Sequence, residues 1–217
     1  VGDVEPSEGE SEVLWGELAK VRKDGMASSI ASLEQFAQTH PSSPWLPSLQ
    51  ANLGRYYMEH AMFSKAIEQW EAAWAATRDA KDGPAKAVAD FTFVYWTKLL
   101  AGLGHMDKLG ALLEEARGRT FDRGSLQEIL NTTRHEYFAM RSSTEMSFRC
   151  GAFAVDAVGR AMRGGDFKSG GIIRVPAPVT GFPMTRLMAL ADESGLSLAA
   201  VEWGGTRQPV VPSVVHW

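Results

Sequence analysis

Apolar residues recur every three or four positions through most of the first half of the chain, and this spacing restricts its fold more than any other feature. A stripe of this period marks the buried face of an α-helix, and short breaks between stripes place successive helices side by side. The sequence therefore predicts paired helices over residues 12–143, preceded by an acidic linker at residues 1–11. The clearest breaks between the helices are Asp24-Gly25, His40-Pro41 and Gly104-His105.

One predicted helix pair has small residues where its two helices would cross. Gly54 and Ala66 occupy these positions, because a larger side chain there would push the helices apart. The other residues of the pattern are Leu53, Tyr57, Trp70 and Ala73. This spacing resembles the tetratricopeptide repeat, with residues 27–41 similar to part of a preceding repeat and residues 97–116 similar to a degenerate following one. The alternative is an irregular helical bundle.

The resemblance to tetratricopeptide repeats implies an interaction surface. Arrays of this kind present a concave face that suits a protein or a peptide. A short array also serves as a spacer between other parts of a protein. The partner expected for residues 12–143 is therefore a protein or peptide, with the remainder of a longer chain of its own as one such partner.

A single cysteine stands where the paired helices give way to a different pattern. Cys150 is followed by Gly151 and then by a run with helical spacing. A thiol at the start of a helix suits nucleophilic chemistry, because the positive end of the helix macrodipole favours a thiolate. The alternative is a structural role, with Cys150 as a small buried apolar residue.

Residues 144–217 are expected to mix helices and strands. The helix that begins at Cys150 is expected to share one apolar face among Phe153, Ala157, Val158, Ala161 and Met162. A second helix is expected over residues 184–194, and strands over residues 172–175, 196–202 and 210–215. The last strand is apolar, so we expect a partner, another chain or the repeat region to cover its edge. The expected fold is thus mainly α, with a partial α+β segment at its end.

A resemblance to a known family covers about residues 144–217. It rests on Ser147-Phe148-Arg149-Cys150-Gly151, on the two helices, and on Val211-Pro212-Ser213-Val214-Val215-His216-Trp217. These features resemble the bacteriocin-processing (double-glycine) peptidases, a branch of the papain-like cysteine peptidases. The resemblance implies that Cys150 is the catalytic nucleophile of an incomplete papain-like domain.

The same resemblance implies that further catalytic groups are needed. In this family a histidine after the strand motif is the general base, and an Asp or Asn further on orients it. His216 matches the histidine within the strand motif and is the less favoured alternative for the base. Papain-like enzymes also place a Gln five or six residues before the cysteine, where this chain has Glu145 and Thr144. We therefore expect this chain by itself to be inactive.

Composition excludes some other classes of function. The net charge of −4 gives no electrostatic reason to expect nucleic-acid binding. No window has the length and apolar character of a membrane span. The remaining histidines are scattered, so no metal or other cofactor is predicted; they are His40, His60, His105 and His135. The chain lacks an initiator Met, so we expect a piece of a longer protein. The resemblance to bacteriocin-processing peptidases implies a bacterial protein, whose compartment is left open and includes export or the cell surface.

Two functions follow from these observations. The first is part of a cysteine peptidase, joined to a helical-repeat region, whose parent processes peptides or its own chain. The second is a non-catalytic interaction or structural module with a degenerate peptidase-like segment. The Cys150-Gly151 pair favours the first, and the missing Gln favours the second.

Overall fold

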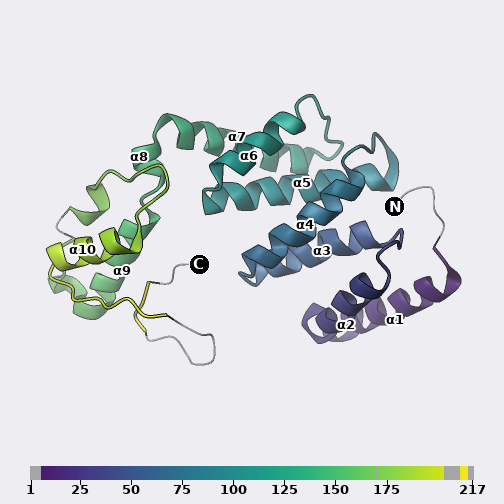
Figure 1. Ribbon diagram of the computed structural model, residues 1–217, viewed down its shortest axis with the longest axis horizontal. Coiled ribbons are helices and arrows are strands. Elements are labelled where there is room, and N and C mark those ends of the chain that lie inside the picture. Colours follow the sequence, from purple (N-terminus) through teal and green to yellow (C-terminus); the bar gives the residue numbers. More distant parts are fainter. Residues whose placement is uncertain (1–5, 170, 203–210, 215–217) are drawn as a thin grey trace. The chain divides into compact units, whose positions relative to one another are not determined.

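The computed structural model describes residues 6–169, 171–202 and 211–214, which are mainly helical (Figure 1). Helices account for 72% of the structure, so the prediction of a mainly α fold is confirmed. The chain forms two compact units, Val1–His135 and Glu136–Trp217. The division falls within α7 (Gly124–Ser142).

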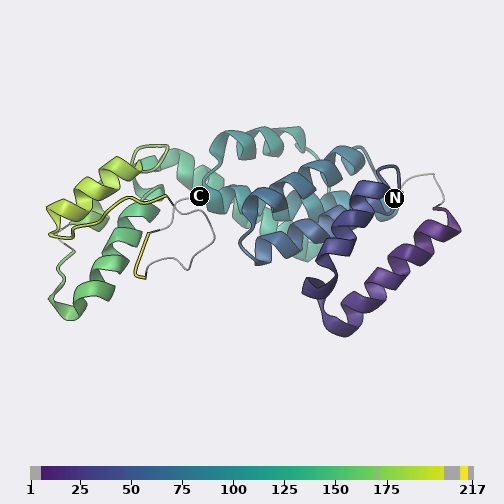
Figure 2. The ribbon, with the colours of Figure 1, turned by 60° about the horizontal axis from the view of Figure 1, so that its bottom comes forward.

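Unit 1 consists of consecutive helices that pack against their neighbours in sequence. The pairs α1 and α2, α3 and α4, and α5 and α6 are in contact, and α4 also packs against α5 (Figure 2). This arrangement is compatible with the helical repeats expected from the sequence. Its helices before α7 are α1 (Glu8–Asp24), α2 (Met26–Thr39), α3 (Leu46–Glu59), α4 (Phe63–Thr77), α5 (Gly83–Leu103) and α6 (Met106–Glu115).

The crossing of α3 and α4 explains the small residues of the central pair. A Cβ atom at Gly54 would lie 2.5 Å from Nε1 of Trp70. The same indole N–H donates a hydrogen bond of 3.1 Å to the carbonyl of Ala51. The other residues of the pattern are all buried, namely Leu53, Tyr57, Ala66 and Ala73. The sequence spacing therefore marks a real contact between two helices.

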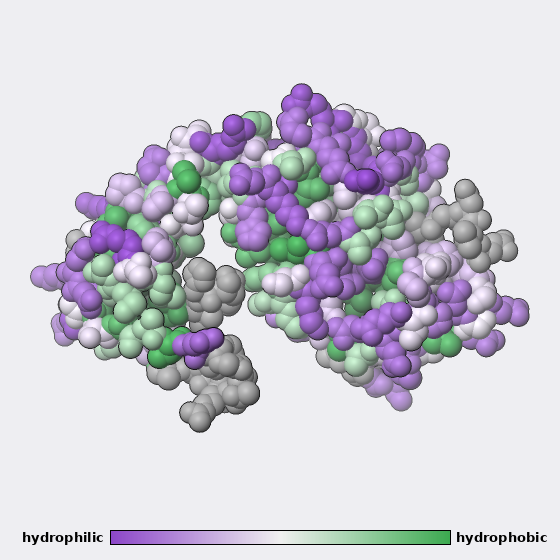
Figure 3. Space-filling view, in the orientation of Figure 1, coloured by the Kyte–Doolittle hydropathy of each residue, from purple (hydrophilic) through white to green (hydrophobic). Residues whose placement is uncertain are grey.

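The turns between the helices also follow from the sequence. Gly104 has φ 71°, a left-handed conformation that glycine adopts without steric cost, and it ends α5. The capping box at the start of α1 joins Ser7 and Glu10 through reciprocal hydrogen bonds. Hydrophilic side chains cover much of unit 1 on the face shown in Figure 3, as expected for the outward sides of amphipathic helices.

Unit 2 is built around α9 (Cys150–Arg163). This helix packs against α10 (Met184–Glu193), and against the 3₁₀ turns η1 (Gly164–Asp166) and η2 (Ile172–Arg174). A short helix, α8 (Thr144–Ser147), precedes it. The helices α9 and α10 approach closely at Gly151, where a Cβ atom would lie 2.8 Å from Cδ2 of Leu187.

The buried face of α9 differs from the expected one. Phe153 and Met162 are 50% and 52% exposed, and Ala157 and Ala161 are exposed as well. Of the expected inward residues only Val158 is buried. The helix buries Ala152, Val155, Asp156, Val158 and Gly159 instead. Apolar residues occur on two sides of this helix, so its spacing did not identify the side that meets α10 and η2.

The strands expected in unit 2 are not found in the part that the structure describes. Residues 172–174 form the 3₁₀ turn η2, and residues 196–202 adopt no regular structure. Of the strand expected over residues 210–215, the structure describes residues 211–214. These residues form a bend and pair with no other strand, and residues 210 and 215 lie outside the described residues. A strand needs a neighbour to satisfy its backbone groups, and the described residues supply none. The α+β character of this segment is therefore not confirmed.

Candidate functional site

Cys150 is the first residue of α9, and its side chain is exposed. Ala152 and Val155 in the first turns of the helix are buried, so the thiol stands on a helix that packing holds in place. The backbone N–H groups of Cys150 and Gly151 donate no hydrogen bond to any residue that the structure describes. Such free N–H groups carry the positive end of the helix macrodipole.

Arg149 ties a later segment to the start of α9. Its Nη1 donates a hydrogen bond of 2.7 Å to the carbonyl of Ile173, and its Nε donates one of 3.2 Å to the carbonyl of Met146. The amide of Ala177 donates to the carbonyl of Glu145 at 3.0 Å. The segment around residues 173–177 is therefore fixed beside the residues that lead into Cys150.

Asp156, midway along α9, ties the loop after the helix to the helix itself. Its carboxylate accepts hydrogen bonds from Nε of Arg160, at 2.8 Å, and from the hydroxyl of Ser169. Arg160 also donates to Ser169 at 2.9 Å. The hydrogen bonds from Arg160 and Ser169 lower the pKa of Asp156 below its ordinary value. The arrangement holds the loop after α9 against the helix, which is a structural role.

The catalytic partners of a thiol peptidase are not assembled around Cys150 by the described residues. His216 is the only histidine in unit 2, and it lies outside them. The side chain of Glu145, at one position where papain-like enzymes carry Gln, is exposed on α8. Within the described ranges, no group of three or more His, Cys, Asp or Glu side chains is placed to hold a metal ion.

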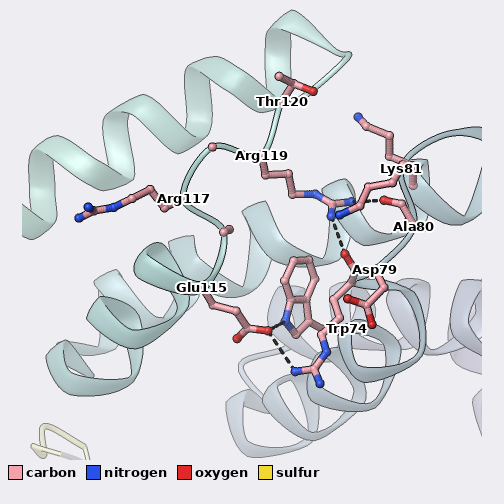
Figure 4. A pocket seen from close by; sticks show the side chains of 12 residues that line it. Trp74, Asp79, Ala80, Lys81, Glu115, Arg117, Arg119 and Thr120 are labelled. Atoms are coloured by element: carbon pink, nitrogen blue, oxygen red, sulfur yellow. Dashed lines mark hydrogen bonds and ion pairs between the residues drawn. The ribbon is translucent and has the colours of Figure 1, made fainter.

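A second candidate site lies in unit 1 and was not predicted from the sequence. A pocket of about 410 Å³ lies between the turn after α4 and the turn after α6 (Figure 4). Its lining carries five cationic side chains and two carboxylates. The lining residues are Trp74, Arg78, Asp79, Ala80, Lys81, Lys86, Glu115, Ala116, Arg117, Gly118, Arg119 and Thr120.

Two of the cations are anchored by carboxylates. Nζ of Lys86 lies 2.7 Å from Oδ2 of Asp90 and 2.7 Å from Oδ2 of Asp122, and the Lys86 and Asp90 side chains are only 7% and 4% exposed. Nε of Arg119 donates to the other oxygen of Asp90 at 2.7 Å. Burial lowers the pKa of Lys86, but the hydrogen bonds to Asp122 and Asp90 outweigh this effect and raise it. Asp90 thus accepts from both cations and favours the charged form of Lys86.

Arg119 also closes the turn after α4. Its Nη1 donates to the carbonyl of Arg78 at 2.7 Å, and its Nη2 donates to the carbonyl of Ala80 at 3.4 Å. Its guanidinium lies over the ring of Trp74, 5.4 Å from the centroid. The side chain of Arg119 therefore joins two turns that are far apart in the sequence, since Arg119 and Arg78 are 41 positions apart.

The outer part of the pocket holds a carboxylate of the chain itself. Oε1 of Glu115 accepts hydrogen bonds from Nε1 of Trp74, at 3.2 Å, and from Nη1 of Arg78, at 3.1 Å. The Arg78 and Glu115 side chains are 51% and 40% exposed. Figure 4 shows Arg117 pointing away from the other cations, whereas Lys81 lies on the same side as Arg119.

Two sequence signals could have pointed to this pocket. The first is the polar stretch between Thr77 and Pro84, which the repeat pattern does not require. The second is the i, i+4 pair of Lys86 and Asp90 on a helix that is otherwise largely apolar. Neither signal shows that Glu115 and Arg119 come from a different turn to complete the pocket.

Comparisons with known proteins identify no relative. No protein-family model, curated protein or solved structure matches the chain significantly. In the part of the chain that the structure describes, no helix has both the length and the apolar character to cross a membrane.

Proposed function

We propose that this chain joins a helical-repeat region, which binds a protein or peptide, to part of a papain-like cysteine peptidase with Cys150 as its nucleophile. One observation supports this proposal most strongly. The thiol is exposed at the first position of α9, a helix of 14 residues whose opposite side is buried. Such a placement presents sulfur to a substrate while the helix stays fixed.

The proposed chemistry follows the general course of thiol peptidases. The general base takes the thiol proton, and the sulfur of Cys150 bonds to the carbonyl carbon of the scissile peptide. The carbonyl oxygen becomes an oxyanion, and the proposed donor to it is the backbone N–H of Cys150, which donates to no other described residue. The leaving amine takes the proton from the imidazolium, and water then hydrolyses the thioester and releases the free thiol.

The general base is not among the residues that the structure describes near Cys150. The family resemblance implies a histidine after the strand motif, with His216 as the alternative. The segment around residues 173–177, which is tied to Arg149 and Glu145, contains no His, Asp or Glu that could serve as the base. The parent protein is the proposed peptidase, and this chain alone is expected to lack activity.

The experiment compares the natural protein that contains this sequence with its Cys150→Ala variant. Both are incubated and followed by mass spectrometry for self-cleavage. Both are also treated with a peptide-based thiol electrophile. We expect cleavage only in the unchanged protein, and labelling at Cys150 that is faster in the native than in the urea-unfolded state. Equal cleavage by both forms, or equal labelling rates in both states, would contradict a catalytic Cys150.

A control separates a nucleophile from a thiol that is merely accessible. Iodoacetamide, which has no peptide recognition element, should alkylate Cys150 in this 217-residue chain in the folded state as well as in the unfolded one, because the side chain is exposed. The variant His216→Ala tests the alternative base. Loss of self-cleavage in that variant would assign the base to His216, whereas retained cleavage would assign it to a histidine elsewhere.

The second candidate function is a non-catalytic interaction or structural module. Glu145 and Thr144 at the positions of the expected Gln favour it, because neither supplies an amide donor to an oxyanion. In that case the natural protein and Cys150→Ala behave alike in the cleavage experiment, while the repeat region still binds its partner. The two candidates therefore give opposite results in one measurement.

A further inference from the structure

The pocket in unit 1 has donor groups that its own carboxylates do not use. Among the described residues, Lys81 makes no hydrogen bond or ion pair. Arg119 uses three N–H groups, on Asp90, Arg78 and Ala80, so two of the five that a guanidinium carries remain free. Both residues line the same cavity.

The pocket also shows which kind of anion its donors accept. The carboxylate of Glu115 receives the indole N–H of Trp74 and a guanidinium N–H of Arg78 on a single oxygen. Hydrogen bonds of this kind to an ionised acceptor are stronger than neutral ones. Because Arg78 and Glu115 are both partly exposed, an incoming carboxylate can reach the same donors.

The buried part of the pocket is fixed before any ligand arrives. Lys86 and Arg119 are held by Asp90, and Arg119 in turn holds the carbonyls of Arg78 and Ala80. Of the proposed donors, Arg119 is therefore ordered before a ligand arrives, which reduces the entropic cost of binding to it. The volume of about 410 Å³ is within the range of sites for small ligands or a few peptide atoms.

We infer that this pocket binds a carboxylate of a partner peptide, with Lys81, Arg78 and the free N–H groups of Arg119 as the donors. The carboxylate comes from an acidic side chain or from a peptide C-terminus, which have the same chemistry. The inference deepens the proposed role of the repeat region as an interaction region. It does not depend on Cys150, which lies in the other unit.

The test follows the indole N–H resonance of Trp74 in the ¹⁵N-labelled 217-residue chain, assigned by triple-resonance spectroscopy. Four probes are titrated at constant ionic strength: Ac-Glu-Glu-Glu-NH₂, Ac-Gln-Gln-Gln-NH₂, Ac-Gln-Gln-Gln with a free C-terminal carboxylate, and inorganic phosphate. We expect a saturable shift with one or both carboxylate peptides and none with the neutral amide. The two carboxylate peptides distinguish a side chain from a C-terminus as the source.

Three variants make the result specific. Lys81→Ala should weaken binding about two- to fivefold, the range expected for one exposed charge pair. The matched control Lys98→Ala removes the same charge from an exposed position on α5 outside the pocket lining and should leave binding unchanged. Glu115→Gln removes the competing carboxylate and should strengthen binding, a change of sign that a damaged fold would not produce.

Several results would overturn the inference. These are no saturable shift of Trp74 with either carboxylate peptide, an equal loss of affinity in Lys81→Ala and Lys98→Ala, and weaker binding in Glu115→Gln. Phosphate binding as tightly as the carboxylate peptides would overturn the assignment to a peptide carboxylate. None of these outcomes affects the cleavage experiment on Cys150, so the two proposals fail separately.

Discussion

Gly54 on α3 and Trp70 on α4 are so close that a Cβ atom at position 54 would lie 2.5 Å from Nε1 of the indole. The indole is fully buried and is held by its hydrogen bond to the carbonyl of Ala51. It therefore cannot move aside without losing both packing and a hydrogen bond. The distance between the two helices depends on the absence of a side chain at Gly54.

Replacing Gly54 by Ala should therefore destabilise unit 1. Overpacking a well-filled core costs about 1–3 kcal/mol, which exceeds the gain of about 1 kcal/mol in helix propensity. The matched control is Gly102→Ala on α5, where a Cβ atom would meet nothing within 4 Å. The control should stabilise the chain by about 0.5–1 kcal/mol. Urea denaturation of both variants checks the prediction, and equal effects would contradict it.

Removing Asp90 from its ion pair with Lys86 should lower the free energy of unfolding. Asp90→Ala leaves Lys86 without its buried partner and removes a partner of Arg119, and the expected loss is about 3–5 kcal/mol. Glu68→Gln, an exposed position on α4 that makes no ion pair among the described residues, should change stability by less than about 0.5 kcal/mol. Similar unfolding midpoints for the two variants would show that the pair is dispensable.

Acid should weaken unit 2 through Asp156. The hydrogen bonds from Arg160 and Ser169 lower its pKa below the ordinary 3.8, so the folded state binds its proton less readily than the unfolded state does. The stabilisation is present above the ordinary pKa and is lost as the pH falls through the lower folded value.

The variant Asp156→Asn isolates this effect. It should be less stable than the unchanged chain by about 1 kcal/mol at neutral pH, since Arg160 is largely exposed and its contribution is screened. The difference should shrink as the pH falls below about 4. Hydrogen exchange of the α9 amides at several pH values measures it. A difference that stays constant down to pH 2 would refute the assignment.

Arg149 should slow the amide hydrogen exchange of the segment around residues 173–177. Arg149→Gln removes the guanidinium that donates to the carbonyl of Ile173. The amide of Ala177, which donates to the carbonyl of Glu145, should therefore exchange about fivefold faster, as a loss of about 1 kcal/mol predicts. The control Arg174→Gln changes an exposed arginine of the same segment whose side chain makes no hydrogen bond among the described residues. Unchanged protection of Ala177 in Arg149→Gln would show that the segment is held by packing alone.

The spacing of residues within each helix could be interpreted from the sequence because it depends on local geometry. The 3.6-residue period identified the helices of unit 1, and Gly54, Ala66 and Trp70 marked the crossing of α3 and α4. The turn at Gly104 was predictable because a left-handed residue at a helix end favours glycine. The position of Cys150 at the start of α9 followed from the same reasoning.

The inward face of α9 could not be read in this way. Phe153 and Ala157 lie on one side and Ala152 and Val155 on another, and each set fits a helical period. The choice between them depends on which neighbour the helix meets, and Leu187 of α10 fits against Gly151 on the side that is buried. The expected strands depend in the same way on partners, which local sequence does not specify.

The sequence by itself therefore determined that this protein consists of paired helices followed by a thiol at the start of another helix, because these features arise between residues a few positions apart. The tertiary structure alone decided the pocket. Trp74 and Glu115 are 41 positions apart, as are Arg78 and Arg119, and only the packing of α4, α5 and α6 brings them together. It also decided that Asp156 faces inward, because a carboxylate is buried only where Arg160 and Ser169 satisfy it.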